Sequence, residues 1–336
     1  MWRGASGLAF FVAGCCFGSS APESTSAAPS VAPMPSPAPP TEVPTCTGAR
    51  CAILEAEAVV ADGVTAYFAT RTHVLALDDD ATTPRVVTEI RTFHVSGMTL
   101  SPTHVYWAEQ GFGTRGAIRR APREGGPAET VTALASYATQ LAADDHGLCW
   151  IAEAQLVCAA EDGTGTRVVQ AVASTFAIDP GETLYVHDQT TLRALPRDGG
   201  APRFVVPLAP ENGTPMSMLV HDGALYVGEN RSRIFGGIAR RTADGARTEL
   251  AEGQWWPTAL VVLGDRVLGT APHVGLVAVP RGGGEPRVVV PHGSYEVHVQ
   301  AALTSRSLWV IEGDPPHAYR FERASLEALE GEPAPR

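Results

Sequence analysis

The strongest constraint on the fold of this chain is a pattern that its sequence repeats seven times. Each copy has an apolar stretch, followed about ten residues later by a β-rich segment that carries an aromatic residue in six of the seven copies. The repeated positions are Tyr67, Tyr106, Trp150, Tyr185, Tyr226, Leu268 and Trp309. Their separations are 39, 44, 35, 41, 42 and 41 residues. A period near 40 is typical of architectures built from one supersecondary unit per repeat.

Each copy has the composition of four short β-strands. The first strands are expected at 56–61, 97–101, 140–144, 175–179, 216–220, 259–263 and 299–304. Glycine and aspartate follow the third strand, for example at 125–126 and 198–199, where they supply the positive φ angles of tight hairpins. The first strand of each copy is apolar on both sides, so we expect it to be innermost.

One four-stranded sheet cannot bury both of its faces, so the copies must stack on one another. The pattern therefore predicts an all-β fold, a β-propeller of about seven four-stranded blades, with six to eight possible. The last copy lacks an obvious fourth strand. Residues 50–54 could supply it and close the ring, or residues 326–329 could do so.

The second copy carries the clearest family likeness. It contains Tyr106-Trp107-Ala108-Glu109 and later Gly125-Gly126. The repeat resembles the bacterial YWTD-like, NHL-like and TolB-like propellers over about residues 55–325, which implies the same fold. Tyr-Trp-Ala-Glu differs from Tyr-Trp-Thr-Asp, so the resemblance does not imply receptor-type ligand recognition, and these families serve many unrelated functions.

The N-terminus has the pattern of an export signal. Arg3 is followed by an apolar core at 8–12 and by Val12-Ala13-Gly14-Cys15. These residues resemble the bacterial lipobox, which implies cleavage before Cys15 and lipidation of its sulfur. The alternative is an ordinary secretory signal. Cys16 follows directly, and by resemblance to enterobacterial sorting it favours the outer membrane, facing the periplasm or the cell surface.

Residues 16–45 are rich in proline, alanine and serine. Such a segment cannot bury enough apolar surface to offset the entropy of ordering, so it is expected to be a disordered tether. The sequence thus divides into a signal peptide with lipobox (1–15), this tether (16–45) and one propeller domain (46–336). The sequence has no stretch of eighteen or more apolar residues, so it predicts no membrane-spanning helix.

Two cysteine pairs lie in the expected domain. Cys46 and Cys51 are expected to close a small loop at the domain edge. Cys149 and Cys158 lie on consecutive predicted strands, and a hairpin turn at 153–154 places them opposite each other at a non-hydrogen-bonded position. Export to an oxidising compartment favours a disulfide there. The alternative is two reduced cysteines that pack as small hydrophobic side chains.

Composition and motifs exclude several functions. Only 18% of residues are charged and the net charge is −11, which argues against nucleic-acid binding. The ten histidines are scattered, and we find no hydrolase, zinc-protease, Walker or Rossmann motif. Asp78-Asp79-Asp80 fits a hairpin turn better than a calcium loop. We therefore expect no catalytic residue, no metal site, no cofactor and a monomeric protein.

The preferred interpretation is a lipid-anchored binding module for a protein, peptide or glycan. The alternative is a metal-dependent propeller hydrolase or lactonase, whose divalent metal would need Glu296, His298, His94 and Gln140 at the central channel. A quinone-dependent dehydrogenase ranks last, because those propellers usually have eight longer blades with a recurring tryptophan motif that is absent here.

The family resemblance implies a ligand site on the loops that enter the first strand and that join the second and third strands. The second-to-third loops are longest in copies two and five. Aromatic and arginine side chains, the usual anchors of binding surfaces, gather in these segments. The candidate ligand face is His94, Phe112, Arg115, Tyr137, Gln140, Arg231, Arg233, Phe235, Trp255, Trp256, Tyr295, Glu296 and His298. The alternative for Trp255, Trp256 and Tyr295 is burial between blades.

Overall fold

A computed structural model describes residues 52–111, 115–179, 183–208, 213–232, 235–271, 274–291, 300–312, 316–328 and 332–333. All of them belong to one compact unit, Pro40–Arg336. Cys15, Cys46 and Cys51 lie outside the described residues. None of the described helices is both long enough and apolar enough to span a membrane.

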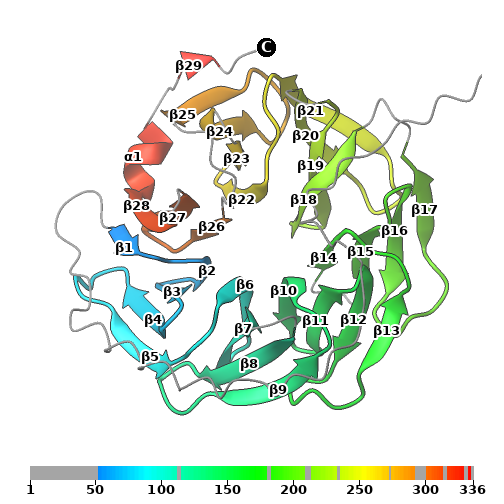
Figure 1. The fold of residues 1–336 in the computed structure, drawn as a ribbon. Helices are drawn as coiled ribbons and strands as arrows, with labels where there is room; N and C mark the ends of the chain where they lie inside the picture. The colour runs from blue at the N-terminus through cyan, green and yellow to red at the C-terminus, as the bar shows by residue number, and fades with distance from the viewer. Residues whose placement is uncertain are drawn as a thin grey trace, which may run out of the picture. The chain divides into compact units, whose positions relative to one another are not determined.

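The described strands form seven antiparallel sheets arranged around a centre, which are the blades of a β-propeller (Figure 1). Blade 1 has β2 (Ala58–Asp62), β3 (Thr65–Ala69), β4 (His73–Asp78) and β5 (Arg85–Glu89); blade 2 has β6 (His94–Leu100), β7 (His104–Gln110), β8 (Gly116–Pro122) and β9 (Glu129–Leu134); blade 3 has β10 (Ala138–Asp144), β11 (Gly147–Ala152), β12 (Gln155–Ala159) and β13 (Arg167–Gln170). Blade 4 has β14 (Thr175–Asp179), β15 (Thr183–His187), β16 (Thr191–Pro196) and β17 (Phe204–Pro207); blade 5 has β18 (Thr214–His221), β19 (Ala224–Asn230), β20 (Gly236–Arg241) and β21 (Arg247–Gly253). Blade 6 has β22 (Ala259–Leu263), β23 (Arg266–Ala271), β24 (Gly275–Pro280), β25 (Arg287–Pro291) and β29 (Glu332–Pro333); blade 7 has β26 (Gln300–Leu303), β27 (Ser307–Glu312), β28 (His317–Glu322) and β1 (Ala52–Leu54).

The ring is closed by the first strand of the described chain. β1 pairs with β28, with Ile53 opposite Ala318, so blade 7 is built from both ends of the domain. This arrangement confirms residues 50–54 as the source of the fourth strand. Leu326, in the alternative segment, instead lies in helix α1 (Arg323–Ala328), where it is buried between blades 6 and 7.

The core consists of apolar layers between neighbouring blades. Each of the seven repeat positions lies on the second strand of its blade and is buried. Phe68 of blade 1 meets Trp309 of blade 7 edge to face, with ring centroids 4.8 Å apart. Aromatic pairs prefer this geometry. The predicted wedge of large side chains between blades is therefore present, and it extends across the closure of the ring.

The first strands are innermost, as expected (Figure 1), but their burial and their starts differ from the expectation. They are less buried than the second strands: β3 and β15 are buried along their whole length, whereas β10 is mostly half-buried. A first strand has a sheet neighbour on one side only and borders the central channel. Three first strands also begin earlier than predicted, at His94, Ala138 and Thr214, because a β-bulge lets pairing continue past the expected start.

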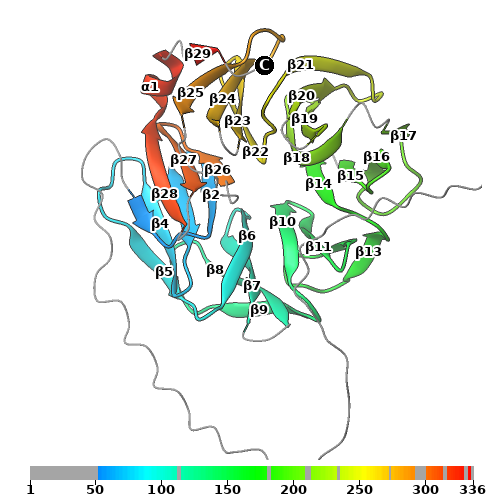
Figure 2. The same ribbon diagram turned by 45° about the horizontal axis from the view of Figure 1, so that its top comes forward.

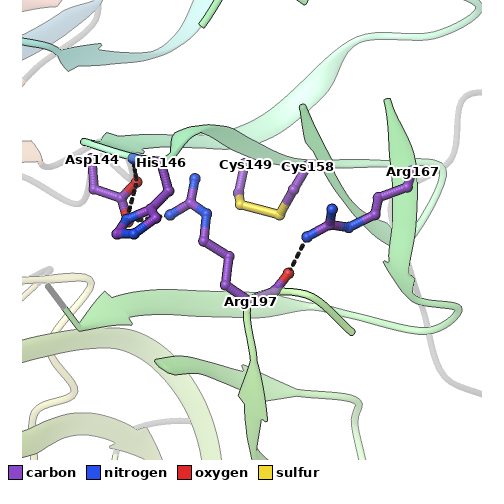
Figure 3. The surroundings of a disulfide bond; sticks show 6 residues. All are labelled: Asp144, His146, Cys149, Cys158, Arg167 and Arg197. Atoms are coloured by element: carbon purple, nitrogen blue, oxygen red, sulfur yellow. Dashed lines mark hydrogen bonds and ion pairs between the residues drawn. A yellow bond between two sulfur atoms is a disulfide. The ribbon is translucent and has the colours of Figure 1, made fainter. Parts of the chain in front are cut away.

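The hairpin of blade 3 has the predicted register. Glu153 and Ala154 both have positive φ angles, of 53° and 58°, as a two-residue type I′ turn requires. Cys149 lies opposite Cys158 and the two form a disulfide, with Cα atoms 4.1 Å apart (Figure 3). The bridge joins the second and third strands of a single blade.

A five-residue turn motif, Pro-Arg-x-Gly-Gly, ties three pairs of blades together. It occurs at 122–126, 196–200 and 280–284, between the third and fourth strands of blades 2, 4 and 6. Each motif arginine forms an ion pair with an aspartate at the end of the first strand, or just after it, in the preceding blade. These pairs, which we call the arginine clamps, are Arg123–Asp62, Arg197–Asp144 and Arg281–Asp222.

Two of the clamps also use the wedge tyrosines. The guanidinium of Arg123 lies 5.3 Å from the ring centre of Tyr67, and that of Arg281 lies 5.9 Å from that of Tyr226. At the clamp of Arg197, Figure 3 shows the guanidinium beside the disulfide, and Arg167 donates to the Arg197 carbonyl from the other side. The glycines of these turns, noted in the sequence as hairpin signals, thus present an arginine to the preceding blade.

Candidate binding face

The propeller has two faces made by different connections. One face carries the segments that enter the first strand of each blade and the loops that join second to third strands; we call it the entry face. The opposite face carries the remaining turns, including the arginine clamps. The second-to-third loops are longest in blades 2 and 5, as predicted. They span residues 111–115 and 231–235. Figure 2 shows the ring tilted, with the first strands around its centre.

Eight of the predicted face residues lie in the described part of the chain: His94, Arg115, Tyr137, Gln140, Arg231, Phe235, Trp255 and Trp256. Phe112, Arg233, Tyr295, Glu296 and His298 lie outside it. Of the eight, Arg115 and Tyr137 are exposed, whereas the others are half-buried or buried.

Gln140 binds the next blade, so its amide has a structural role. Its Oε1 accepts from the Phe176 amide at 3.0 Å, and its Nε2 donates to Thr175 Oγ1 at 3.0 Å. Trp255 is fully buried in the apolar layer between blades 5 and 6, where it fills a wedge as the alternative interpretation stated. Trp256 beside it is half-buried.

Arg231 is the centre of an ion-pair network in blade 5. It contacts Glu229 at 3.3 Å, Glu252 at 2.5 Å and also Glu249. Arg247 joins the same carboxylates, contacting Glu229 and Glu249 at 2.7 Å each. Glu229 is almost fully buried, and a buried carboxylate needs paired cations to offset its desolvation. Arg231 is therefore committed to holding Glu229, which limits its use as a ligand anchor.

His94 belongs to a contact between blades 1 and 2 that is centred on Glu57. The Glu57 carboxylate accepts from the Val95 amide at 2.6 Å and from Arg71 Nε at 2.8 Å, and it lies 3.3 Å from His94 Nδ1. Burial alone raises the pKa of Glu57, but the hydrogen bonds from His94, Arg71 and Val95 outweigh it and lower that pKa. The carboxylate is held ionised between the two blades.

Similar side-chain bridges run around the inner strands. Gln300 Oε1 accepts from the Val59 amide at 3.2 Å, which joins blade 7 to blade 1. Ser96 donates to the Ala138 carbonyl of blade 3, and Ser217 donates to the Pro257 carbonyl at 3.0 Å, ahead of blade 6. A first strand presents an unpaired backbone edge to the channel. These polar side chains satisfy part of that edge near the entry face.

Four large apolar side chains are exposed on the entry face, in four consecutive blades. They are Phe93 (53% exposed), Tyr137 (47%), Val172 (45%) and Met216 (40%), at the start of the first strands of blades 2, 3, 4 and 5. We call this set the apolar crescent. Sequence analysis named only Tyr137. The signal for the others was an apolar residue just before, or at the beginning of, an expected first strand.

Blade 4 contributes a buried histidine that sequence analysis also missed. Ser174 Oγ lies 3.0 Å from His187 Nδ1 and donates to the His187 carbonyl at 3.1 Å. His187 is fully buried, and its Nε2 has no hydrogen-bond partner among the described residues. Next to it, Asp188 accepts from Thr190, Thr191 and Arg193 and fixes the loop that follows β15. This arrangement ties the segment before β14 to the end of β15.

One hollow of about 600 Å³ lies between blades 1 and 2 on the opposite face. The clamp of Arg123 and Asp62 lies in its wall, together with Tyr67, Arg85 and Glu124. Its charges are of both signs, and it follows the contact between the blades. Across the described part of the chain, no group of three or more His, Cys, Asp or Glu side chains could hold a metal ion.

Comparison with known proteins identifies the fold class without a family. No family model matches the chain, and no curated protein matches it. The β-propeller domain of Cps50 (Swd1) from Myceliophteria thermophila matches 81% of this chain and 99% of its own, with 11% identity and a TM-score of 0.63. A chain of the mitotic checkpoint complex matches with 13% identity and a TM-score of 0.64, covering 85% of this chain and 95% of its own.

A third similar structure is YCF48 bound to the D1 peptide. It covers 84% of this chain and 99% of its own, with 10% identity and a TM-score of 0.59. Identities this low establish the shared architecture only. The protein is thus a seven-bladed β-propeller, and what it binds has to be inferred from its own surface.

Proposed function

We propose that this protein is a lipid-anchored module of the bacterial cell envelope that binds a protein, peptide or glycan on its entry face. The observation that carries the proposal is the apolar crescent. Single exposed apolar side chains are common, but several that lie on one face in successive blades mark an interaction site. The peptide complex of YCF48, a propeller of similar shape, is consistent with this use of the fold.

The direction of β1 supports the same assignment. Ala52 pairs with Tyr319 within β28, whereas Leu54 pairs with His317 at the entry-face end of that strand. The chain therefore runs toward the entry face as it joins the ring. In the proposed arrangement Cys15 carries the lipid, and residues 16–45 connect it to the domain. Attachment through the N-terminal end of β1 leaves the entry face available to a partner, and the lipid is the contact with the membrane.

Two experiments on the full chain test the proposal. Metabolic labelling with an alkyne fatty acid should mark the protein, and Cys15→Ala should abolish the label and release the chain from the membrane fraction. A photo-crosslinking amino acid placed at Tyr137 should give a covalent adduct in intact cells. The control is the same amino acid at Val64, an exposed apolar residue on the opposite face. Adducts from Val64 alone, or from neither position, would contradict the proposed binding face.

A further inference from the structure

Among the entry segments that the structure describes, those of blades 2 to 5 carry the apolar crescent. The equivalent segment of blade 6 carries Trp255, which is fully buried, and that of blade 1 carries Glu57, which is bound between blades. In this protein an entry segment can therefore bury a large side chain, so the exposure of the crescent side chains is not imposed by the fold. Contacts between β6 and β10, β10 and β14, and β14 and β18 place the four exposed positions in neighbouring blades (Figure 1).

Three of the four crescent blades also have a β-bulge near the start of the first strand. The pairing of first and second strands shifts between Val95 and Gly97, between Ala138 and Gln140, and between Pro215 and Ser217. The first strands of blades 1, 4, 6 and 7 pair with their second strands without such a shift. A bulge re-aims the side chains beside it and is often found next to a functional site. In blade 5 the bulged residue is Met216, a member of the crescent.

The backbone beside the crescent offers few places for strand addition. The Val95 amide is bound by Glu57, the Ala138 carbonyl by Ser96, and the Phe176 amide by Gln140. The Ala143 amide, farther along β10, is bound by Thr99 at 3.0 Å. A peptide that adds a strand needs a row of free amides and carbonyls. Recognition at this edge must therefore rely on side chains.

The chemistry of the crescent favours a protein segment over a glycan. Three of the four crescent side chains, those of Phe93, Val172 and Met216, provide no hydrogen bonds to sugar hydroxyls, whereas all four can pack against apolar side chains. Arg115 precedes Gly116, whose backbone packs closely against that of Ser136 and Tyr137, so the start of β8 lies beside the segment that enters β10. Arg115 is exposed, and no partner for its side chain lies among the described residues. An exposed arginine on the same face as exposed apolar side chains is a typical anchor of protein interfaces.

From these observations we infer that the entry face binds a protein segment that places apolar side chains on Phe93, Tyr137, Val172 and Met216 and a carboxylate on Arg115. The inference rests on the proposed function and specifies its partner. Arginine binds a carboxylate through a charge-assisted hydrogen bond, and the neighbouring apolar contacts exclude water from that bond. Contact runs through side chains across blades 2 to 5.

The test uses the full chain in its membrane, with the photo-crosslinking amino acid at Val172 and the adducts identified by mass spectrometry. The crosslinked partner peptide is expected to carry Asp or Glu close to large apolar residues. Arg115→Glu should lower the adduct yield about tenfold or more, because a charge-assisted contact is replaced by repulsion. The matched control is Arg306→Glu, since Arg306 is exposed on the opposite face. Changing the partner's acidic residue to lysine should restore the yield of Arg115→Glu.

The outcomes separate the two levels of the proposal. Adducts to a glycan or lipid would overturn this inference, and so would an adduct yield that Arg115→Glu does not change. Either result would still leave a binding face at the crescent. The absence of adducts from Val172, Tyr137 and Val64 alike would overturn the proposed function itself. If Arg115→Glu and Arg306→Glu lowered the adduct yield equally, the net charge of the protein would control binding rather than a local contact with Arg115, and this inference would be wrong.

Discussion

The two faces of this propeller connect the same strands but differ in how their side chains are used. On the opposite face, motif turns bring arginines onto aspartates of the preceding blade, and Asp79 of blade 1 accepts from Thr304 Oγ1 and from the Arg306 amide of blade 7. On the entry face, large apolar side chains and Arg115 are exposed. Cross-blade hydrogen bonds there involve the first strands and the residues just before them, such as Glu57 and Pro257. Both faces thus join blades, but the turns of the opposite face are used mainly for this purpose, whereas the entry face also leaves apolar side chains and an arginine available.

Replacing Arg197 should have the largest effect on stability. Arg197 and Asp144 are both mostly buried, and Arg197→Met leaves the carboxylate without its cation. Breaking a buried ion pair by removing one partner typically costs about 3 kcal/mol or more. Chemical denaturation should show a loss of about 3 kcal/mol, while the yield of entry-face crosslinks at native conditions stays unchanged. Arg281→Met is the control, because Arg281 and Asp222 are more exposed and its loss should be smaller.

Removal of the disulfide should have the next largest effect. Cys149 and Cys158 enclose a short loop, and opening a loop of this length costs about 2–3 kcal/mol in the chain-entropy model. The double variant Cys149→Ala, Cys158→Ala should therefore unfold at lower denaturant than the parent. Adding reductant to the parent should reproduce the shift. A double variant as stable as the oxidised parent would mean that packing, rather than the crosslink, holds this hairpin.

The stability of the fold should depend on pH through His187. Burial lowers the pKa of His187, since the charged imidazolium is desolvated, and Asp188 only partly offsets this. Because the folded-state pKa lies below the unfolded value of about 6.5, the stability contribution is complete above pH 6.5 and is lost as the pH falls. One linked proton corresponds to a slope of up to about 1.4 kcal/mol per pH unit.

Urea unfolding at pH 7 and pH 5 would measure this slope, and His187→Asn should flatten it. Asp188 does not interfere in this window. Burial by itself raises the pKa of Asp188, but hydrogen bonds from Thr191, Arg193 and Thr190 lower it to about 2. Its contribution is present above the unfolded value and is lost only as the pH falls from about 4 toward 2. Identical slopes in the parent and His187→Asn would assign the pH dependence to other groups.

Substitutions in the crescent should have the smallest effect on stability. Phe93→Ser or Tyr137→Ser removes a side chain that is about half exposed, so the free energy of unfolding should fall by about 1–2 kcal/mol. The same variants should weaken partner binding. Trp255→Ser, a buried neighbour on the same face, is the contrasting control and should destabilise the fold strongly. A crescent variant that destabilises as much as Trp255→Ser would show that these side chains serve packing.

The sequence predicts the fold well because each repeat marks the same structural positions. The wedge aromatics, the turn glycines and the register between Cys149 and Cys158 all depend on local spacing, which a sequence displays directly. For the strand that closes the ring, the sequence leaves two candidate segments, because only one copy lacks an obvious fourth strand. Choosing between them requires the pairing of β1 with β28.

The binding face is harder to predict, because exposure depends on neighbouring blades. Gln140 is a polar residue of the kind that contacts ligands, yet its side-chain oxygen accepts a hydrogen bond from the Phe176 amide of the next blade. Trp255 and Tyr137 occupy similar places in the sequence pattern, but one is buried and the other exposed. β-Bulges leave no mark in a single sequence, so the displaced starts of β6, β10 and β18 were missed. These properties arise between repeats, where spacing along the chain carries little information.

The closure of the ring by β1 has a consequence for the order of events during biosynthesis. β1 is synthesised before every other described strand, whereas its partner β28 comes almost at the end. Contacts this distant in sequence form slowly, because the intervening chain must be ordered first. Until β28 has been made, β1 has no strand to pair with, and the two ends of the open ring expose unpaired blade surfaces. The first strand to be made is thus among the last to become ordered.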